Sequence, residues 1–215
     1  MEKMKVGILG SGDVGKAFAR AFSDLGHRVK IGSRSPEKLN DFAAEAGPLV
    51  TGSTFEETAR FGDLMVLATL GTATQGAIQL AGPKHFEGKV VLDATNPLTR
   101  GPDGISLEIG HSISAGEKVQ GWAAGASVFK TLNTTGFGNM ANSVYNGVKS
   151  VMFVAGDDAA NKPKVIELVS QLGFDVVDAG PLRNARLLEA HAMLWIDLAV
   201  ARGQGRDFAF AFLRR

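Results

Sequence analysis

The chain contains no cysteine among its 215 residues. This lack excludes disulfide bonds, thiolate catalysis, zinc–thiolate sites and iron–sulfur clusters. It is also compatible with a reducing compartment, so we expect a cytoplasmic protein. The four histidines do not have the spacing of metal ligands, and we predict no metal site.

The chain also has little excess charge and no long hydrophobic run. Its 23 basic and 22 acidic residues leave a formal charge of +1, which gives no general attraction for nucleic acid or for an anionic membrane. The longest uninterrupted apolar run, residues 208–213, is too short to span a bilayer. The apolar and charged fractions, 45% and 21%, are those of a folded chain. We therefore expect a folded protein with neither nucleic acid nor a membrane as a partner.

Short apolar segments of strand length alternate with longer amphipathic segments, which is typical of βα units around a parallel sheet. We predict strands at 5–9, 28–31, 64–68, 90–93, 127–131, 150–155 and 175–178, and helices at 14–25, 36–46, 159–172 and 182–202. The expected fold class is α/β, with a Rossmann-type doubly wound, mostly parallel sheet. One domain over residues 1–215 would contain a nucleotide-binding core (1–132) and a C-terminal α/β extension (133–215).

Glycine is in excess, with 27 residues, and the first glycines form a motif. Residues 10–15 match G-x-G-x-x-G directly between a predicted strand and a predicted helix, the context of a dinucleotide-binding loop. Gly10 permits the tight turn, Gly12 lets the backbone approach a pyrophosphate, and Gly15 lets the helix pack closely. The alternative is an ordinary tight turn. We predict that the pyrophosphate is bound by Gly10, Ser11, Gly12, Asp13, Val14 and Gly15.

The residues after the second predicted strand indicate NADP rather than NAD. NAD-binding units carry an acidic residue about 20 positions beyond the glycines, where it binds the ribose hydroxyls. Here Ser33 and Arg34 occupy that region, and their hydroxyl and guanidinium groups donate hydrogen bonds to a 2′-phosphate. Residues 35–37, Ser-Pro-Glu, also suit the start of a helix, and the two roles are compatible.

The loops after the later strands, residues 68–72, 94–98 and 132–137, contain no Lys, His, Asp or Glu. Reduction of a carbonyl needs a proton donor close to the reacting oxygen. Hydride transfer to a flavin or deazaflavin ring can rely on positioning instead, so the loops favour a ring acceptor and leave the catalytic residue unknown.

Two alternatives stay open at this point. One is a reductase of a small carbonyl compound with His111 as proton donor, and the other is a redox sensor that binds NADP without turnover. The remaining histidines are expected to have no catalytic role, with His27 and His85 at the surface and His191 packed within the long helix.

Four segments together resemble the family of NADPH-dependent coenzyme F420 reductases: residues 10–15, residues 32–34 with Lys38, residues 93–97, and residues 178–182 with Asn184, Arg186 and residues 188–189. A related architecture occurs in the cytosolic domain of STEAP-type metalloreductases. The resemblance implies a Rossmann fold with a C-terminal extension, NADP on the glycine loop, and coenzyme F420, FMN or FAD against the nicotinamide. It implies that Ser33, Arg34 and Lys38 hold the 2′-phosphate. Beside the two rings it places Thr69, Leu70, Asn96, Asn133 and Thr134.

The C-terminal segment 208–213 alternates phenylalanine with small or aliphatic residues, which predicts a strand with Phe208, Phe210 and Phe212 on one face. These rings would pack on the protein's own core, at a subunit interface or in a wall of the acceptor site. We expect a homodimer built by the long helix and this strand. The other expected partner is a small-molecule redox acceptor.

Overall fold

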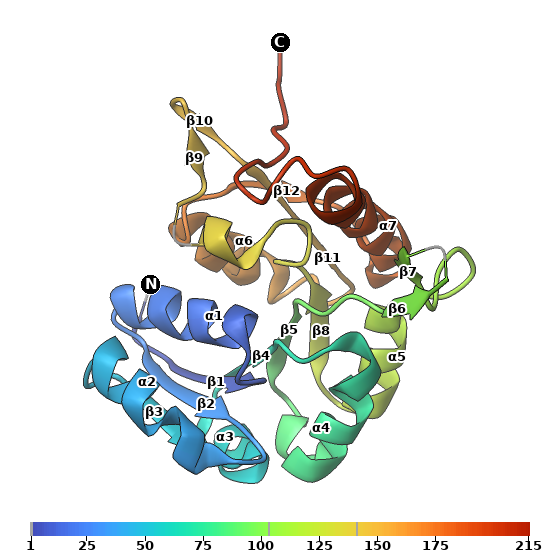
Figure 1. Ribbon diagram of the computed structural model, residues 1–215. Helices are drawn as coiled ribbons and strands as arrows, with labels where there is room; N and C mark the ends of the chain where they lie inside the picture. Colours follow the sequence, from blue (N-terminus) through green and yellow to red (C-terminus); the bar gives the residue numbers. More distant parts are fainter. Residues whose placement is uncertain (1, 103, 141) are drawn as a thin grey trace.

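The computed structural model describes residues 2–102, 104–140 and 142–215, and its centre is an eight-stranded sheet (Figure 1). The strand order is β12-β11-β8-β5-β4-β1-β2-β3. Six strands, from β3 to β8, are parallel in the order of a Rossmann sheet, and β11 then pairs antiparallel with β8. The bounds are β1 (Lys5–Leu9), β2 (Arg28–Gly32), β3 (Val50–Ser53), β4 (Leu64–Leu67), β5 (Val90–Asp93), β8 (Ser127–Lys130), β11 (Val151–Gly156) and β12 (Asp175–Asp178).

Helices cover both faces of the sheet because successive strand residues point to opposite faces and both sets are apolar. In β1, Val6 and Ile8 belong to one core, whereas Leu9 belongs to the other. The first core is closed by α1 (Asp13–Asp24), α2 (Asn40–Ala46) and α6 (Lys162–Gln171). The second is closed by α3 (Phe55–Phe61), α4 (Thr74–Ala81) and α5 (Ala115–Trp122). Helix α7 (Ala185–Ile196) contacts α5 and lies beside β11 in Figure 1.

The predicted fold class is confirmed, and most predicted strands agree with the structure within a residue or two. The predicted helix at 182–202 consists of a 3₁₀ turn (Leu182–Asn184), α7 and a π-helical turn (Asp197–Ala201). The sheet runs without a break from β3 to β12. The division of a single domain near residue 132 stays a prediction.

Several short elements were absent from the predicted set. Strand β3 and helix α3 are four and seven residues long, and β3 exposes part of its length at the sheet edge, so neither has a clear hydrophobic period. Helices α4 and α5 have eight residues each. Two small hairpins lie outside the sheet: β6 (Leu98–Gly101) with β7 (Gly104–Leu107), and β9 (Val144–Tyr145) with β10 (Val148–Lys149).

The predicted C-terminal strand is wrong. Residues 208–215 have no regular structure, although the Val151 amide donates a hydrogen bond to the Phe210 carbonyl. Phe208 stacks on Trp195 of α7 with ring centroids 5.2 Å apart, and Phe210 lies edge-on to His191 at 4.6 Å. Phe212, in contrast, stays 45% exposed. The alternation in the sequence therefore marks an extended segment that packs on α7 rather than a member of the sheet.

The predicted surface position of His27 is also wrong. Its side chain is 1% exposed, and its Nδ1 accepts a hydrogen bond from the Met4 amide. The phenyl ring of Phe22 lies 6.2 Å away, between ring centroids. Burial is the main cause that lowers the pKa of His27.

Among the described residues, no helix has the length and apolar character that crossing a membrane requires.

Candidate functional site

A cavity of about 600 Å³ opens at the carboxyl ends of β1 and β4, the point where the strand order of the sheet reverses. Open α/β sheets bind ligands at this point because the loops after the two strands diverge there. Eight predicted site residues line the cavity: Gly10, Ser11, Gly12, Ser33, Arg34, Lys38, Thr69 and Leu70. The other lining residues are Ser35, Phe55, Ala68, Thr72, Ala73, Gly76, Ala77 and Leu80.

The glycine loop has the geometry that a pyrophosphate needs. Gly10 has φ 121°, which disfavours any residue with a side chain, and a Cβ on Gly15 would lie 1.8 Å from the Gly10 carbonyl oxygen. A Cβ on Gly12 would meet nothing within 4 Å, and Gly12 borders the cavity. The backbone is thus uncovered at the start of α1, whose first amides carry partial positive charge and could donate hydrogen bonds to a phosphate. The described residues fit a bound dinucleotide.

The segment after β2 has the groups that recognise an additional phosphate. The Ser11 hydroxyl donates a hydrogen bond to the Ser33 hydroxyl (3.2 Å), which in turn accepts one from the Ser35 amide (3.1 Å). The Ser35 side chain makes no capping bond to the following 3₁₀ turn (Pro36–Leu39). Arg34 and Lys38 are exposed and border the same cavity, so both are accessible to a ligand.

Another part of the cavity lining is apolar. It includes Gly76, Ala77 and Leu80 of α4, and Phe55 at the start of α3. A Cβ on Gly76 would meet nothing within 4 Å, so this wall leaves room for a flat ring. Together with Arg34, whose guanidinium can stack on a base, the wall suits an adenine.

The remaining predicted site residues do not line this cavity. Asp13, Val14 and Gly15 form the first turn of α1, where Val14 packs against the core and Asp13 borders a separate surface groove. Thr134 is 4% exposed, and its hydroxyl lies 3.5 Å from the sulfur of Met152 in β11. Thr134 therefore faces the C-terminal part of the sheet.

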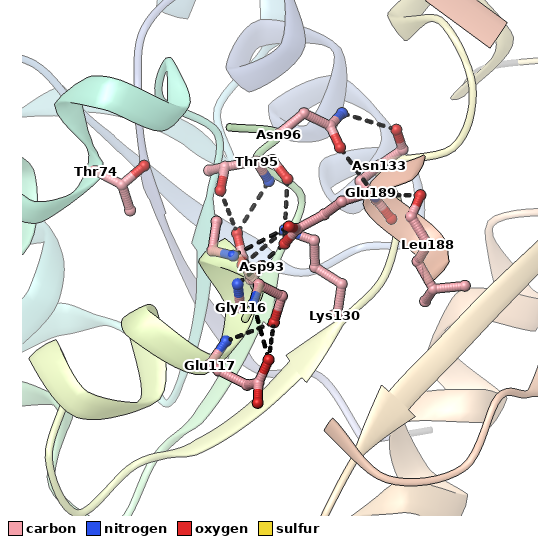
Figure 2. A network of polar contacts seen from close by, with 12 residues as sticks. Thr74, Asp93, Thr95, Asn96, Gly116, Glu117, Lys130, Asn133, Leu188 and Glu189 are labelled. Atoms are coloured by element: carbon pink, nitrogen blue, oxygen red, sulfur yellow. Dashed lines mark hydrogen bonds and ion pairs between the residues drawn. The ribbon is translucent and has the colours of Figure 1, made fainter. Parts of the chain in front are cut away.

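Asn96 and Asn133 connect the loops after β5 and β8. The side-chain amide of Asn96 donates a hydrogen bond to the backbone carbonyl of Asn133 (3.0 Å). The side-chain amide of Asn133 donates one to Asn96 Oδ1 (3.0 Å) (Figure 2). A Cβ on Gly71 would lie 2.2 Å from the Asn96 carbonyl oxygen, so the loop after β4 also touches this pair. The loops after β4, β5 and β8 thus meet beyond the glycine loop, at the end of the site where a nicotinamide would lie.

Three charged residues under these loops were not predicted. Lys130 lies 2.9 Å from Asp93 Oδ2 and 2.9 Å from Glu189 Oε1, and all three side chains are 0% exposed (Figure 2). Burial acts to lower the pKa of Lys130, but the two carboxylates outweigh it and raise the pKa, so the ammonium stays charged. One signal in the sequence could have indicated the pairing of Asp93 with Lys130. These two charged residues end two neighbouring strands, and a neutral loop begins one residue after Asp93 and two residues after Lys130.

The other histidines have no place in the cavity wall. His111 is exposed, has φ 64° and precedes α5, outside the residues that line the cavity. His85 lies in a 3₁₀ turn (Pro83–Phe86) and accepts a hydrogen bond from Arg60. His191 packs between Phe153 and Phe210, and burial lowers its pKa. The predicted packing role of His191 agrees with this position.

The chain is similar to proteins of known type over most of its length. A family model described as NADP oxidoreductase, coenzyme F420-dependent, matches residues 5–97. The F420-dependent NADP reductase of Methanothermobacter thermautotrophicus is 27% identical over 210 residues, which cover 92% of this chain and 90% of that protein. A crystal structure from Arthrobacter sp. FB24, provisionally named an F420-dependent NADP reductase, is 35% identical with a TM-score of 0.90, over 98% of this chain and all of that one.

A second group of relatives is longer. Metalloreductase STEAP3 of Rattus norvegicus is 28% identical over 190 residues, which cover 88% of this chain. The same residues cover 36% of the metalloreductase, so the chain spans about a third of that relative's length.

Proposed function

The chain belongs to the family of coenzyme F420-dependent NADP oxidoreductases, and from this premise we propose that it transfers hydride between NADP(H) and a deazaflavin or flavin ring. Its class, an NADP-dependent oxidoreductase, follows from the family. The proposal concerns the identity of the acceptor and the residues that serve the reaction.

In this proposal the cavity at the β1–β4 edge holds NADP. The amides of the glycine loop bind the pyrophosphate, Ser33, Arg34 and Lys38 bind the 2′-phosphate, and the α4 wall covers the adenine. When bound, the reduced dinucleotide would supply a hydride from its dihydronicotinamide ring, and the oxidised form would accept one there. The loops that carry Thr69, Asn96 and Asn133 then orient that end of the site.

One observation carries the choice of acceptor: the two titratable side chains in the described cavity wall, Arg34 and Lys38, both lie at the 2′-phosphate end. At the other end the exposed or half-buried side chains of Thr69, Leu70 and Asn96 are neutral. A carbonyl acceptor needs a nearby acid, whereas a ring acceptor takes hydride at carbon or nitrogen and its proton from water. The neutral surroundings therefore support a ring acceptor.

The experiment is an assay of NADPH oxidation with coenzyme F420, FMN, FAD, quinones and a panel of small carbonyl compounds. Turnover with one of the first three, and none with carbonyls, is the expected result. Arg34→Ala provides a matched control, because it should lose activity at low NADPH while keeping the acceptor preference. Turnover confined to carbonyl compounds would refute the proposal.

We propose further that the active protein is a homodimer built on α7. Leu187 and Leu194 lie seven residues apart on the same side of this helix and are 66% and 51% exposed. The tail contributes less than the sequence predicted, because Phe208 and Phe210 cover the protein's own α7.

Light scattering should give twice the 22.6 kDa of one chain. Leu187→Glu should reduce that mass and Val144→Glu, on β9, should not; a wild-type monomer at micromolar concentration would contradict the proposal.

A further inference from the structure

The buried ion network of Asp93, Lys130 and Glu189 joins three parts of the chain that are far apart in sequence. Asp93 and Lys130 are register partners at the ends of β5 and β8, and Glu189 comes from α7. The two oxygens of Glu189 also accept hydrogen bonds from the amides of Ala115 and Gly116, at the start of α5 (3.0 Å each). The network has two carboxylates and one ammonium, so it has one negative charge in excess. The two backbone amides stabilise that charge through their hydrogen bonds to Glu189.

The network extends directly into the loop after β5. The Lys130 ammonium donates to the Thr95 carbonyl oxygen, and Asp93 Oδ1 accepts from both the amide (3.0 Å) and the hydroxyl (2.7 Å) of Thr95. Thr95 is thus fixed at three atoms, one residue before Asn96 (Figure 2). Any displacement of Lys130 therefore moves the loop that borders the nicotinamide end.

The loop after β8 is fixed from the same helix. The side-chain amide of Asn133 donates a hydrogen bond to the backbone carbonyl of Leu188 (3.3 Å). Two consecutive residues of α7, Leu188 and Glu189, therefore hold Asn133 and Lys130. Between these two anchors Leu132 has φ 61°, a left-handed conformation that is unfavourable for a branched side chain, and is 1% exposed. Such conformations persist where the surrounding contacts over-determine them, and they cluster at ligand sites.

We propose that Lys130 is a positioning residue for the nicotinamide end of the site, through which α7 sets the separation of the loops that carry Asn96 and Asn133. This inference rests on the proposed function. A network that served stability alone would need no contact with the Thr95 carbonyl, and apolar residues of similar volume often stabilise such a core equally well. The network acts through the loops, because its three side chains are fully buried.

The test compares Lys130→Met with Arg186→Met. Arg186 of α7 forms a separate ion pair with Glu117 of α5, and its side-chain hydrogen bonds in the described structure go to Glu117 and to neither loop. Both variants weaken the attachment of α7, but Lys130→Met alone removes the link to Thr95. The control thus separates positioning from attachment.

Two binding measurements and one kinetic measurement give the result. The affinity for 2′,5′-ADP, which has the 2′-phosphate and no nicotinamide, should stay within about twofold in both variants. The fluorescence anisotropy of saturating NADPH, which reports how firmly the dihydronicotinamide is held, should fall in Lys130→Met and stay at the wild-type value in Arg186→Met. With the ring acceptor, kcat should fall about 10- to 100-fold in Lys130→Met, with a change of less than about threefold in the KM for NADPH.

Each other outcome has a definite meaning. Wild-type anisotropy in Lys130→Met, or an equal loss in both variants, would overturn the positioning role. If Lys130→Met does not fold, the isosteric Glu189→Gln takes its place, because it removes the charge by which α7 holds Lys130 while the bonds from Lys130 to Asp93 and Thr95 remain. The anisotropy of bound NADPH should again fall, with the affinity for 2′,5′-ADP unchanged. Failure of the wild-type protein to bind 2′,5′-ADP would instead refute the NADP site itself, and so the proposed function.

Discussion

The hydroxyl of Ser11, in the glycine loop, donates a hydrogen bond to the hydroxyl of Ser33, one residue beyond β2, over 3.2 Å. The bond joins the glycine loop to the segment after β2, the two parts of the site that we propose bind the pyrophosphate and the 2′-phosphate. Since Ser33 also accepts from the Ser35 amide, its side chain is held in place before a ligand arrives. Preorganised donors of this kind lose little entropy on binding.

Arg34→Ala should weaken NADPH binding by about 10- to 150-fold, because a charge-assisted hydrogen bond contributes roughly 1.5 to 3 kcal/mol. NADH lacks the 2′-phosphate, so its affinity should hardly change. Fluorescence titration with both dinucleotides measures the two effects. Equal losses for NADPH and NADH would show that Arg34 does not contact the 2′-phosphate.

Gly12→Val should abolish measurable binding of both NADPH and NADH without lowering the thermal stability. Its side chain would enter open space in the free protein, at the position expected for the pyrophosphate. Gly15→Ala is the informative comparison, because its Cβ would clash with the Gly10 carbonyl oxygen and should lower the melting temperature. Calorimetry and thermal unfolding of both variants test the contrast, and normal NADPH binding by Gly12→Val would place the pyrophosphate elsewhere.

How much of this site the sequence predicts depends on the range of the interactions. The glycine loop and Ser33, Arg34 and Lys38 are local signals, and the structure brings all of them to one cavity except the residues that form the first turn of α1. Lys130 and Glu189 are 59 positions apart (189 − 130), and their pairing depends on how α7 packs on the sheet. No periodicity or propensity encodes a contact of that range.

His111→Ala should change kcat with the ring acceptor by less than about twofold. His111 is exposed before α5 and does not line the described cavity, so it is poorly placed to donate a proton. Steady-state kinetics of the variant test this directly. A loss of about 100-fold or more would instead support the carbonyl reductase with His111 as its acid.

Arg186→Met should destabilise the protein at neutral pH and have progressively less effect in acid. Two hydrogen bonds from Arg186 are the main cause that lowers the pKa of Glu117 from 4.5 to about 2. A carboxyl group with a depressed folded-state pKa stabilises the fold above its unfolded pKa, and that contribution disappears as the pH falls through the folded value. Because both side chains are partly exposed, we expect about 1 kcal/mol at pH 7. Urea unfolding between pH 7 and pH 3 measures it, and a difference independent of pH would contradict the assignment.

Titration calorimetry of the wild-type protein with NADP⁺ and NAD⁺ tests the central claim most directly, since the two ligands differ only in the 2′-phosphate. Two cationic side chains and a held serine hydroxyl should make NADP⁺ bind at least about 100-fold more tightly. Equal affinities, or tighter binding of NAD⁺, would contradict the account.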